Sequence, residues 1–277
     1  MKLGLIGGTL GHSCSPAIHE KLFDILNLKG QHEYGLLEMD RNDIPNELKR
    51  LNREHYTGMN VTIPYKLDVM PFLTDMSREA RTIGAVNTIH ITDKGCFGYN
   101  TDYSGFGRSL QHAGIDVRGT HTVVLGTGGA ARAVIQYLAD SGAAAVTVVS
   151  RQPHSKPEFE LFSKSVGAEV VGYDRLAFCK RTDILINCTP VGMYPATGEA
   201  PVTEQMVAQY PAVVDLIYNP KDTLILQYAK RHRAVTLNGM YMLVAQAVGS
   251  EEIWLSRQIE ASIIEKIAKE MEMRYEY

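Results

Sequence analysis

The 277-residue sequence has few of the features that mark specialised protein classes. Its four cysteines are scattered and form no C-x-x-C pair, so neither a disulfide framework nor a structural zinc site is expected. It has no run of about 18 apolar residues, so we expect no membrane span. A net charge of −3 offers no basic footprint of the kind that binds nucleic acid.

The start of the chain also differs from a secretory signal, because a strand-like apolar run begins within its first residues. Scattered cysteines with free thiols fit a reducing compartment. We therefore expect a cytoplasmic protein without a metal centre. Its thiols would lie at Cys14, Cys96, Cys179 and Cys188.

Short apolar runs typical of strands alternate with segments of helical periodicity along most of the chain. This alternation predicts parallel βαβ units with right-handed crossovers. Ser15-Pro16 is expected to open the first helix, with Ser15 as its N-cap. Asp93-Lys94-Gly95 is typical of a hairpin turn. Strands are expected at residues 3–7, 34–39, 60–63, 88–92, 96–99, 122–125, 145–150, 183–188, 212–216 and 234–237.

The length allows two domains, each with its own core. We expect a substrate-binding domain over residues 1–103 and a nucleotide-binding domain over 104–238. Residues 239–277 are expected to be mainly helical, to break near Gly249-Ser250 and to pack back on the first domain. The predicted fold class is α/β: an N-terminal α/β domain and a Rossmann-type domain with a doubly wound parallel sheet, with a cleft between them.

A glycine-rich turn follows the strand expected at residues 122–125 and precedes a helix. Gly126, Gly128 and Ala131 match G-x-G-x-x-A, which allows a tight turn and close approach of a pyrophosphate. Gly129 and Ala130 would lie at the start of the helix, where unpaired N–H groups favour phosphate. A glycine-rich turn without a ligand has the same pattern, but the strand, helix and second strand around it favour a dinucleotide site.

The end of the second strand of this unit indicates which dinucleotide binds. A site for NAD typically has an acidic residue there, which bonds the ribose 2′-hydroxyl. This chain has Arg151 instead, and Lys156 follows a few residues later. An arginine suits a 2′-phosphate, so we predict NADP, although a solvated surface arginine would look the same in the sequence.

A lysine and an aspartate, Lys66 and Asp102, lie 36 residues apart in uncharged, turn-prone sequence. Such a pair can relay a proton to a substrate oxygen. The alternatives are a surface cation for Lys66 and helix capping for Asp102. Small polar residues that can hydrogen-bond a sugar-like ligand surround both; they are Asn60, Thr62, Asn87, Thr88, Asn100 and Thr101.

Two further segments carry candidate ligand contacts. Ser13 and Ser15 flank the start of the first helix, and their hydroxyls could bind a carboxylate. Gln246 lies among apolar residues near the end of the chain. Its amide is either a ligand contact or a buried amide whose hydrogen bonds the protein itself provides.

Taken together, these segments resemble the shikimate dehydrogenase family over nearly the whole chain. Any one of the seven motifs would be weak evidence, but all seven in the same order would very rarely occur by chance. The motifs are Gly11-His-Ser-Cys-Ser-Pro-Ala-Ile-His19, Asn60-Val-Thr-Ile-Pro-Tyr-Lys66, Gly84-Ala-Val-Asn-Thr88, Gly98-Tyr-Asn-Thr-Asp102, Asn187-Cys-Thr-Pro-Val-Gly-Met193, Asp215-Leu-Ile-Tyr-Asn-Pro220 and Asn238-Gly-Met-Tyr-Met-Leu-Val-Ala-Gln-Ala247.

The resemblance implies reversible, NADP-dependent reduction of 3-dehydroshikimate to shikimate, in the pathway to aromatic amino acids. It implies that Lys66 and Asp102 are the catalytic pair. The substrate-binding residues that it implies are Ser13, Ser15, Thr62, Asn87, Tyr218 and Gln246. The cofactor-binding residues that it implies are Gly126, Gly128, Gly129, Ala130, Arg151, Leu216 and Gly239. The partner is a small-molecule substrate, and the chain would act as a monomer or homodimer.

Three other functions share this scaffold. A dual quinate/shikimate dehydrogenase, which can be NAD-linked, would differ only in small contacts near Ser13 and Ser15. A non-catalytic NADP-binding regulatory protein would be expected to have lost Lys66 or Asp102, and both are present. A folate-linked dehydrogenase would lack the paired serines. Fold analogy does not separate these functions, because function depends on the site.

Overall fold

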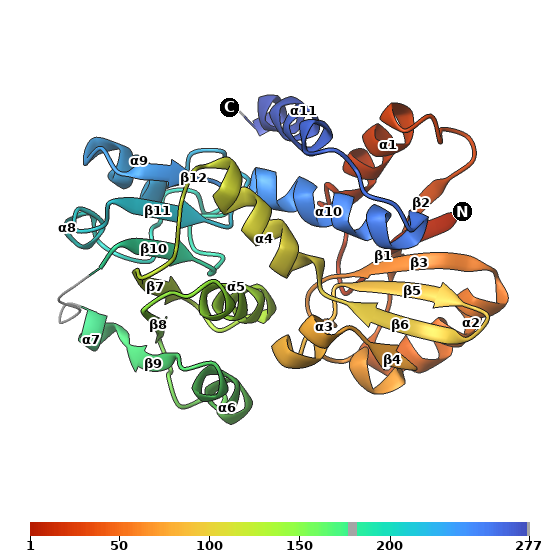
Figure 1. Cartoon of the computed structure of the whole chain (residues 1–277), viewed down its shortest axis with the longest axis horizontal. Helices are drawn as coiled ribbons and strands as arrows, with labels where there is room; N and C mark the ends of the chain where they lie inside the picture. Colours follow the sequence, from red (N-terminus) through yellow and green to blue (C-terminus); the bar gives the residue numbers. More distant parts are fainter. Residues whose placement is uncertain (177–181, 276–277) are drawn as a thin grey trace. The chain divides into compact units, whose positions relative to one another are not determined.

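The computed structural model describes residues 1–176 and 182–275, and the chain divides into two compact units (Figure 1). Unit 1 comprises Met1–Gly105 and Val244–Ile267, and unit 2 comprises Phe106–Leu243 and Ala268–Tyr277. The first boundary between the units follows Gly105, two residues after the boundary that we expected at residue 103. The end of the chain is divided between the units, whereas we expected all of residues 239–277 to lie with the first domain.

Unit 1 contains a mixed six-stranded sheet with the order β2-β1-β3-β5-β6-β4. β1 lies parallel to β2 and β3, whereas β5 is antiparallel to both β3 and β6, which confirms the predicted hairpin. Strand bounds are β1 (Lys2–Gly7), β2 (Glu33–Glu38), β3 (Tyr56–Val61), β4 (Asp75–Met76), β5 (Thr88–Thr92) and β6 (Gly95–Tyr99). Helix bounds are α1 (Ser15–Ile25), η1 (Arg41–Asp43), α2 (Ile44–Arg53), η2 (Met70–Phe72), α3 (Arg78–Ile83), α4 (Thr101–His112) and α10 (Met240–Leu255). α4 begins in unit 1 and continues into unit 2, whereas α10 begins in unit 2 and continues into unit 1.

Unit 2 contains a fully parallel six-stranded sheet with the order β12-β11-β10-β7-β8-β9. Counted within this unit, the order is 3-2-1-4-5-6 read from β9, which is that of a doubly wound Rossmann sheet and confirms the predicted fold class. Strand bounds are β7 (His121–Leu125), β8 (Ala145–Ser150), β9 (Glu169–Gly172), β10 (Ile184–Asn187), β11 (Ala212–Asp215) and β12 (Val235–Leu237). Helix bounds are α5 (Gly129–Asp140), α6 (Pro157–Ser165), α7 (Tyr173–Leu176), α8 (Glu204–Val207), α9 (Leu224–Arg231), α11 (Ala261–Glu272) and η3 (Met273–Tyr275). Of these, α11 begins in unit 1 and continues into unit 2 after Ile267.

The core of unit 2 explains why its strands read as continuous apolar runs. Val124 of β7 packs into one hydrophobic cluster, whereas Val123 and Leu125 pack into another, as expected for successive side chains on opposite faces. All three are at most 2% exposed, so both faces of the sheet are covered. Burial of each such side chain contributes about 1.5–3 kcal/mol.

Two local expectations were wrong. α1 begins at Ser15 itself, with Cys14 in the N-cap position and no side-chain cap, because the Ser13 hydroxyl accepts the Ser15 N–H at 3.2 Å. α10 is continuous through Gly249-Ser250 and ends at Leu255, before Ser256 with its left-handed φ of 52°. The missing side chain of Gly249 lets another segment approach, since an added Cβ would lie 3.3 Å from Thr101.

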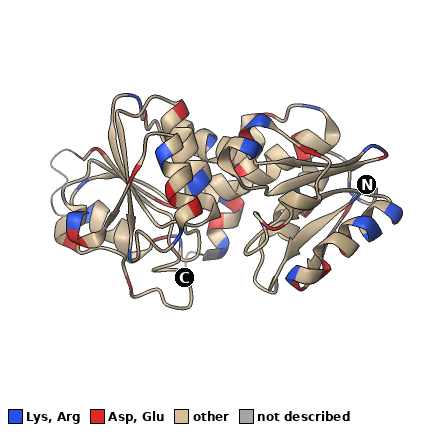
Figure 2. Ribbon diagram, turned by 90° about the horizontal axis from the view of Figure 1, so that it is seen from below, with Lys and Arg blue, Asp and Glu red and all other residues tan. Residues whose placement is uncertain are grey.

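Charges of both signs are interspersed along the helices of each unit (Figure 2). Among the described residues, no helix has the length and apolar character needed to cross a membrane. The same residues contain no group of three or more side chains suited to holding a metal ion. Cys14, Cys96 and Cys188 are not joined in disulfides, and Cys179 lies outside the described residues.

Candidate functional site

The register of the unit 1 sheet brings distant sequence segments to a single edge. β1 and β3 are parallel, so the residues that follow them, which include Ser13 and Thr62, start from the same edge. β5 runs antiparallel to β3 with Thr88 opposite Asn60, and Tyr99 at the end of β6 pairs with Thr88. The residues next to these strand ends therefore gather at this edge.

Lys66 and Asp102 form an ion pair at this edge of the sheet. Lys66 Nζ donates to Asp102 Oδ2 at 2.5 Å, and the two side chains are 15% and 9% exposed. The Lys66 main chain is fixed as well, because its carbonyl accepts the Val86 N–H at 2.8 Å. Lys66 is therefore paired and largely buried, and its interpretation as a surface cation is wrong.

Asp102 lies in the first turn of α4 rather than at its cap. The capping role belongs to Asn100, whose Oδ1 accepts the Tyr103 N–H at 3.2 Å. The helix dipole favours a carboxylate in this first turn. Both oxygens of Asp102 instead face side chains, with Oδ2 on Lys66 and Oδ1 accepting from Asn87 at 3.0 Å. Asp102 is thus free of a capping duty and available to the site.

Asn87 is held in a single orientation beside this pair. Its Oδ1 accepts the backbone N–H of Thr101 at 2.7 Å, and a backbone N–H can only donate. The Nδ2 group must therefore point the other way, where it donates to Asp102 Oδ1 at 3.0 Å and to Gln246 Oε1 at 3.3 Å. The structure brings together four predicted site residues: Lys66, Asp102, Asn87 and Gln246.

A buried polar cluster lies behind Asn87. Asn60, Thr88 and Thr101 are at most 4% exposed and bond to one another and to Ser250. We predicted that these residues could contact a ligand, but their polar atoms are already occupied by protein partners. Asn100 is also buried, and its amide donates to the Ala85 carbonyl at 2.9 Å.

Ser13, Ser15 and Thr62 are half-buried near the same edge. The Thr62 main chain is fixed from both sides, since its N–H donates to Ile6 at 2.9 Å and its carbonyl accepts from Tyr65 at 2.9 Å. Ser15 hydrogen-bonds the Tyr34 side chain, whose hydroxyl donates to Asn60 at 2.7 Å. Burial raises the pKa of Tyr34 well above its usual value, so the phenol stays protonated.

Ser250 was not among the predicted site residues, because Gly249-Ser250 was expected to be a helix break. This residue is fully buried and bonds to Asn60 and Thr88. Its position four residues after Gln246 puts both on one helix face, which is a signal that could have identified it.

The glycine turn of unit 2 follows β7 and opens α5. Gly126 has a φ of 105°, and an added Cβ would meet the Cys188 carbonyl at 3.1 Å, so this position requires glycine. Gly128 is the N-cap of α5 without a side-chain cap, and an added Cβ there would meet nothing within 4 Å. The first N–H groups of α5, from Gly129 and Ala130 onward, are thus not covered by a capping side chain.

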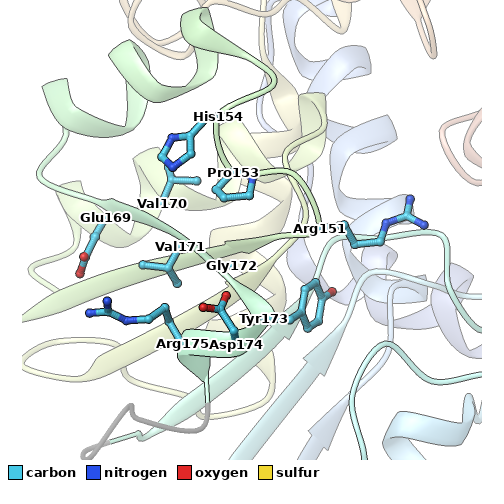
Figure 3. A pocket seen from close by; sticks show the side chains of 10 residues that line it. All are labelled: Arg151, Pro153, His154, Glu169, Val170, Val171, Gly172, Tyr173, Asp174 and Arg175. Atoms are coloured by element: carbon cyan, nitrogen blue, oxygen red, sulfur yellow. The ribbon is translucent and has the colours of Figure 1, made fainter.

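Arg151 follows the end of β8 and lines a pocket of about 710 Å³ in unit 2 (Figure 3). Tyr173 lies beside it; burial raises the pKa of this phenol and the charge of Arg151 works in the opposite direction. Lys156 Nζ donates to the carbonyl of Thr127 in the glycine turn at 3.2 Å. Arg151 and Lys156 are both exposed, so two cations are available in this part of unit 2.

Asp215, at the end of β11, holds two loops of unit 2 together. It is fully buried and accepts hydrogen bonds from Thr223 Oγ1 at 2.6 Å, Ile217 N–H at 3.0 Å and Asn187 Nδ2 at 3.0 Å. Burial raises its pKa to about 6, and these hydrogen bonds oppose the rise. Tyr218, which was predicted to bind substrate, follows three residues later and belongs to unit 2.

Leu216 and Gly239 are in backbone contact within unit 2. The Leu216 N–H donates to the Asn187 carbonyl at 3.0 Å, and the Gly239 N–H donates to the Ile217 carbonyl at 2.9 Å. A Cβ at Gly239 would lie 2.0 Å from the Leu216 carbonyl oxygen. Only glycine fits between these segments.

Comparisons with known proteins show which family this chain belongs to. A family model for the shikimate dehydrogenase substrate binding domain matches residues 5–89. The shikimate dehydrogenase (NADP(+)) of Clostridium perfringens (strain 13 / Type A) is 43% identical over 277 residues, which cover 99% of this chain and 100% of that protein.

Solved structures give the same result. A chorismate mutase/shikimate 5-dehydrogenase fusion protein from Clostridium acetobutylicum matches with a TM-score of 0.94 at 42% identity, covering 100% of this chain and 98% of that chain. Shikimate 5-dehydrogenase from Thermus thermophilus, in complex with NADP(H) and shikimate, matches with a TM-score of 0.85 at 30% identity, covering 98% and 99%. With similarity over nearly its full length, this chain belongs to the shikimate dehydrogenase family.

Proposed function

We propose that this chain catalyses the reversible reduction of 3-dehydroshikimate to shikimate with NADPH, a step in aromatic amino acid biosynthesis. The observation that carries the proposal is the Lys66–Asp102 ion pair, joined by Asn87 at one edge of the unit 1 sheet. Membership of a family whose relatives are named as NADP(+) enzymes supports both the reaction and the cofactor.

Lys66 is the general acid in this proposal. Reduction of a ketone produces a developing alkoxide, which needs a proton and a nearby positive charge. The Lys66 ammonium group supplies both, and its neutral amine removes the hydroxyl proton in the direction of oxidation. Asp102 orients the ammonium group through its Oδ2, which leaves Oδ1 to face Asn87.

Asn87 and Gln246 are placed to bind substrate hydroxyls next to Asp102. They share one hydrogen bond with each other at 3.3 Å, and a hydroxyl could accept from Asn87 or donate to Gln246. Ser13, Ser15 and Thr62 lie half-buried near the same edge and would bind the substrate carboxylate. The family resemblance adds Tyr218 to the substrate contacts.

NADPH supplies the hydride when it is bound, and unit 2 fits this cofactor. The open space at Gly128 and the uncapped N–H groups of α5 suit a pyrophosphate. An exposed Arg151 replaces the acidic residue that would bond a 2′-hydroxyl, and its guanidinium suits a 2′-phosphate, with Lys156 adding charge. Leu216 and Gly239 are the proposed contacts at the nicotinamide end.

The substrate and cofactor are tested by initial rates followed by absorbance near 340 nm. Purified protein is given shikimate or quinate, each with NADP⁺ or NAD⁺. Turnover of shikimate with NADP⁺ is expected to exceed the other three combinations. Preferred turnover of quinate, or equal use of NAD⁺, would replace the proposal by the dual-specificity dehydrogenase. No turnover in any combination would favour the non-catalytic regulatory protein.

We also propose a cytoplasmic location and either a monomer or a homodimer. The location is supported by the buried Cys14 and Cys96, which are not in disulfides and so fit a reducing compartment. Light scattering of the purified chain would measure its mass in solution and decide between the two assembly states.

A further inference from the structure

Ser250 of α10 is fully buried, and its hydroxyl contacts three elements other than its own helix. Asn60 Nδ2 of β3 donates to Ser250 Oγ at 2.8 Å, and Thr88 Oγ1 of β5 lies 2.8 Å from it. Thr101 Oγ1 of α4 lies at 3.3 Å. Within α10 the same hydroxyl reaches the Gln246 carbonyl at 3.1 Å. One side chain therefore connects β3, β5 and α4 to the helix that carries Gln246.

The neighbouring Gly249 makes this contact possible. Helices α4 and α10 lie side by side here (Figure 1), and an added Cβ at Gly249 would lie 3.3 Å from Thr101 and 3.6 Å from Ser104. The 3.3 Å contact is tighter than most, so an added side chain would require Thr101 to shift by a few tenths of an ångström. The glycine thus keeps the Ser250 hydroxyl within reach of Thr101.

A main-chain carbonyl fixes which end of the Asn60 side-chain amide donates and which end accepts. Its Nδ2 group faces the Asn87 carbonyl at 3.3 Å, and a carbonyl can only accept. Its Oδ1 accepts the Tyr34 hydroxyl at 2.7 Å on the opposite side. Asn60 therefore acts as a donor toward both Ser250 Oγ and Thr88 Oγ1, the latter at 3.2 Å.

The hydrogen-bond direction that Asn60 sets extends through Thr88 to Asn87. Thr88 Oγ1 accepts from Asn60 and donates its one proton to Asn87 Oδ1 at 3.1 Å. The Ser250 hydroxyl is then the donor in its contact with Thr88 and shares its proton with the Gln246 carbonyl. Asn87 Oδ1 then receives donors from Thr88 and from the Thr101 N–H, which turns Nδ2 toward Asp102. All these groups are at most 6% exposed, so water does not replace a lost partner without cost.

We propose that Ser250 is a positioning residue for the reaction. Its hydroxyl holds Asn60 and Thr88 so that Asn87 presents its N–H to Asp102, which in turn holds Lys66. This inference rests on the proposed catalytic role of Lys66 and Asp102. Ser250 touches no substrate or cofactor in this account and acts through Asn87.

The first test is Ser250→Ala in the full-length chain, with shikimate and NADP⁺. We expect kcat to fall roughly tenfold, as for a small misplacement of a catalytic group. KM for NADP⁺ should stay at the wild-type value, because the proposed cofactor residues belong to unit 2. Ser109→Ala is the matched control, since Ser109 is 1% exposed and its hydroxyl donates within α4 to Phe106 at 2.7 Å. It should lower the melting temperature without lowering kcat.

A double-mutant cycle separates positioning from a general loss of stability. If Ser250 acts through Asn87, then adding Ser250→Ala to Asn87→Ala should lower kcat by less than about twofold further. If Ser250→Ala lowers kcat as much in the Asn87→Ala variant as it does in wild type, Ser250 acts independently of Asn87. That result would overturn the inference. Equal kcat values for the Ser250→Ala and Ser109→Ala variants would overturn it as well.

Wild-type turnover distinguishes this inference from the proposed function. A wild-type chain that does not oxidise shikimate with NADP⁺ would refute the proposed function and the inference with it. An active wild type with an unaffected Ser250→Ala variant would refute the positioning role only.

Discussion

Replacing Asp215 by asparagine is expected to remove a pH dependence from the stability of unit 2. Asp215 is fully buried at the end of β11, and burial raises its pKa from 3.8 to about 6. In the unfolded chain the carboxyl returns to its ordinary pKa. Between these two values the folded state therefore binds a proton that the unfolded state has released.

The sign follows from this difference in bound protons. A raised pKa in the folded state means that protonated Asp215 contributes stability that is fully present below the unfolded-state pKa. This contribution is lost as the pH rises through about 6, the folded-state value. The wild type should therefore lose stability relative to Asp215→Asn as the solution is made less acidic.

The size follows from the two pKa values. The full shift of about two units corresponds to roughly 3 kcal/mol, at about 1.4 kcal/mol per unit. Only the upper part of this window is experimentally convenient. Between about pH 5 and about pH 7.5 the expected loss is about 1.4 kcal/mol.

The assay is urea unfolding of wild type and Asp215→Asn at several pH values in this range. The two proteins can differ in free energy of unfolding at every pH without affecting the test. Only the change of that difference with pH is compared with the prediction. Asp116→Asn is the control: Arg118 lowers the pKa of this exposed carboxyl to about 2, so it does not titrate in the window. Parallel wild-type and Asp215→Asn curves from about pH 5 to about pH 7.5 would refute the reasoning.

Two further predictions concern the reaction. The rate of shikimate oxidation should rise with pH, because the neutral Lys66 amine is the base in that direction; a flat profile through the alkaline range, with the chemical step limiting, would contradict the role of Lys66. Arg151→Ala should raise KM for NADP⁺ by roughly tenfold or more and leave KM for NAD⁺ nearly unchanged, since a charge-assisted bond to the 2′-phosphate is lost. Initial-rate kinetics with both cofactors measure this, and an equal change for the two would show that Arg151 does not read the phosphate.

Much of the fold could be predicted from local sequence signals. The alternation of apolar runs with helical periodicity predicted the strands of both units except β4 and β9, and it predicted the hairpin at residues 93–95. The glycine pattern predicted a turn between β7 and α5. Strand order could not be predicted, because it depends on which faces bury one another over long sequence separations. The short helices α3, α6, α7, α8 and α9 were also missed, since none of them is long enough to reveal a clear period.

The sequence indicated which residues form the site, but not which of them bind one another instead of a ligand. Lys66 and Asp102 were chosen for their chemistry, and the sheet register that joins them across 36 residues appears only in three dimensions. Asn60 and Thr88 look like ligand contacts in the sequence, yet burial turns them into partners of each other. Gly249 looked like a helix break, because a sequence does not reveal that Thr101 of α4 packs against it.

The catalytic role of Lys66 is tested by comparing kcat of Lys66→Ala with that of wild type, using shikimate and NADP⁺ at saturating concentrations. Lys49→Ala, at an exposed position of α2, is the matched control. We expect kcat to fall by at least about a hundredfold in Lys66→Ala, the usual contribution of a general acid–base group, and to be unchanged in the control. Wild-type turnover by Lys66→Ala, as measured by the change in absorbance near 340 nm, would contradict that role.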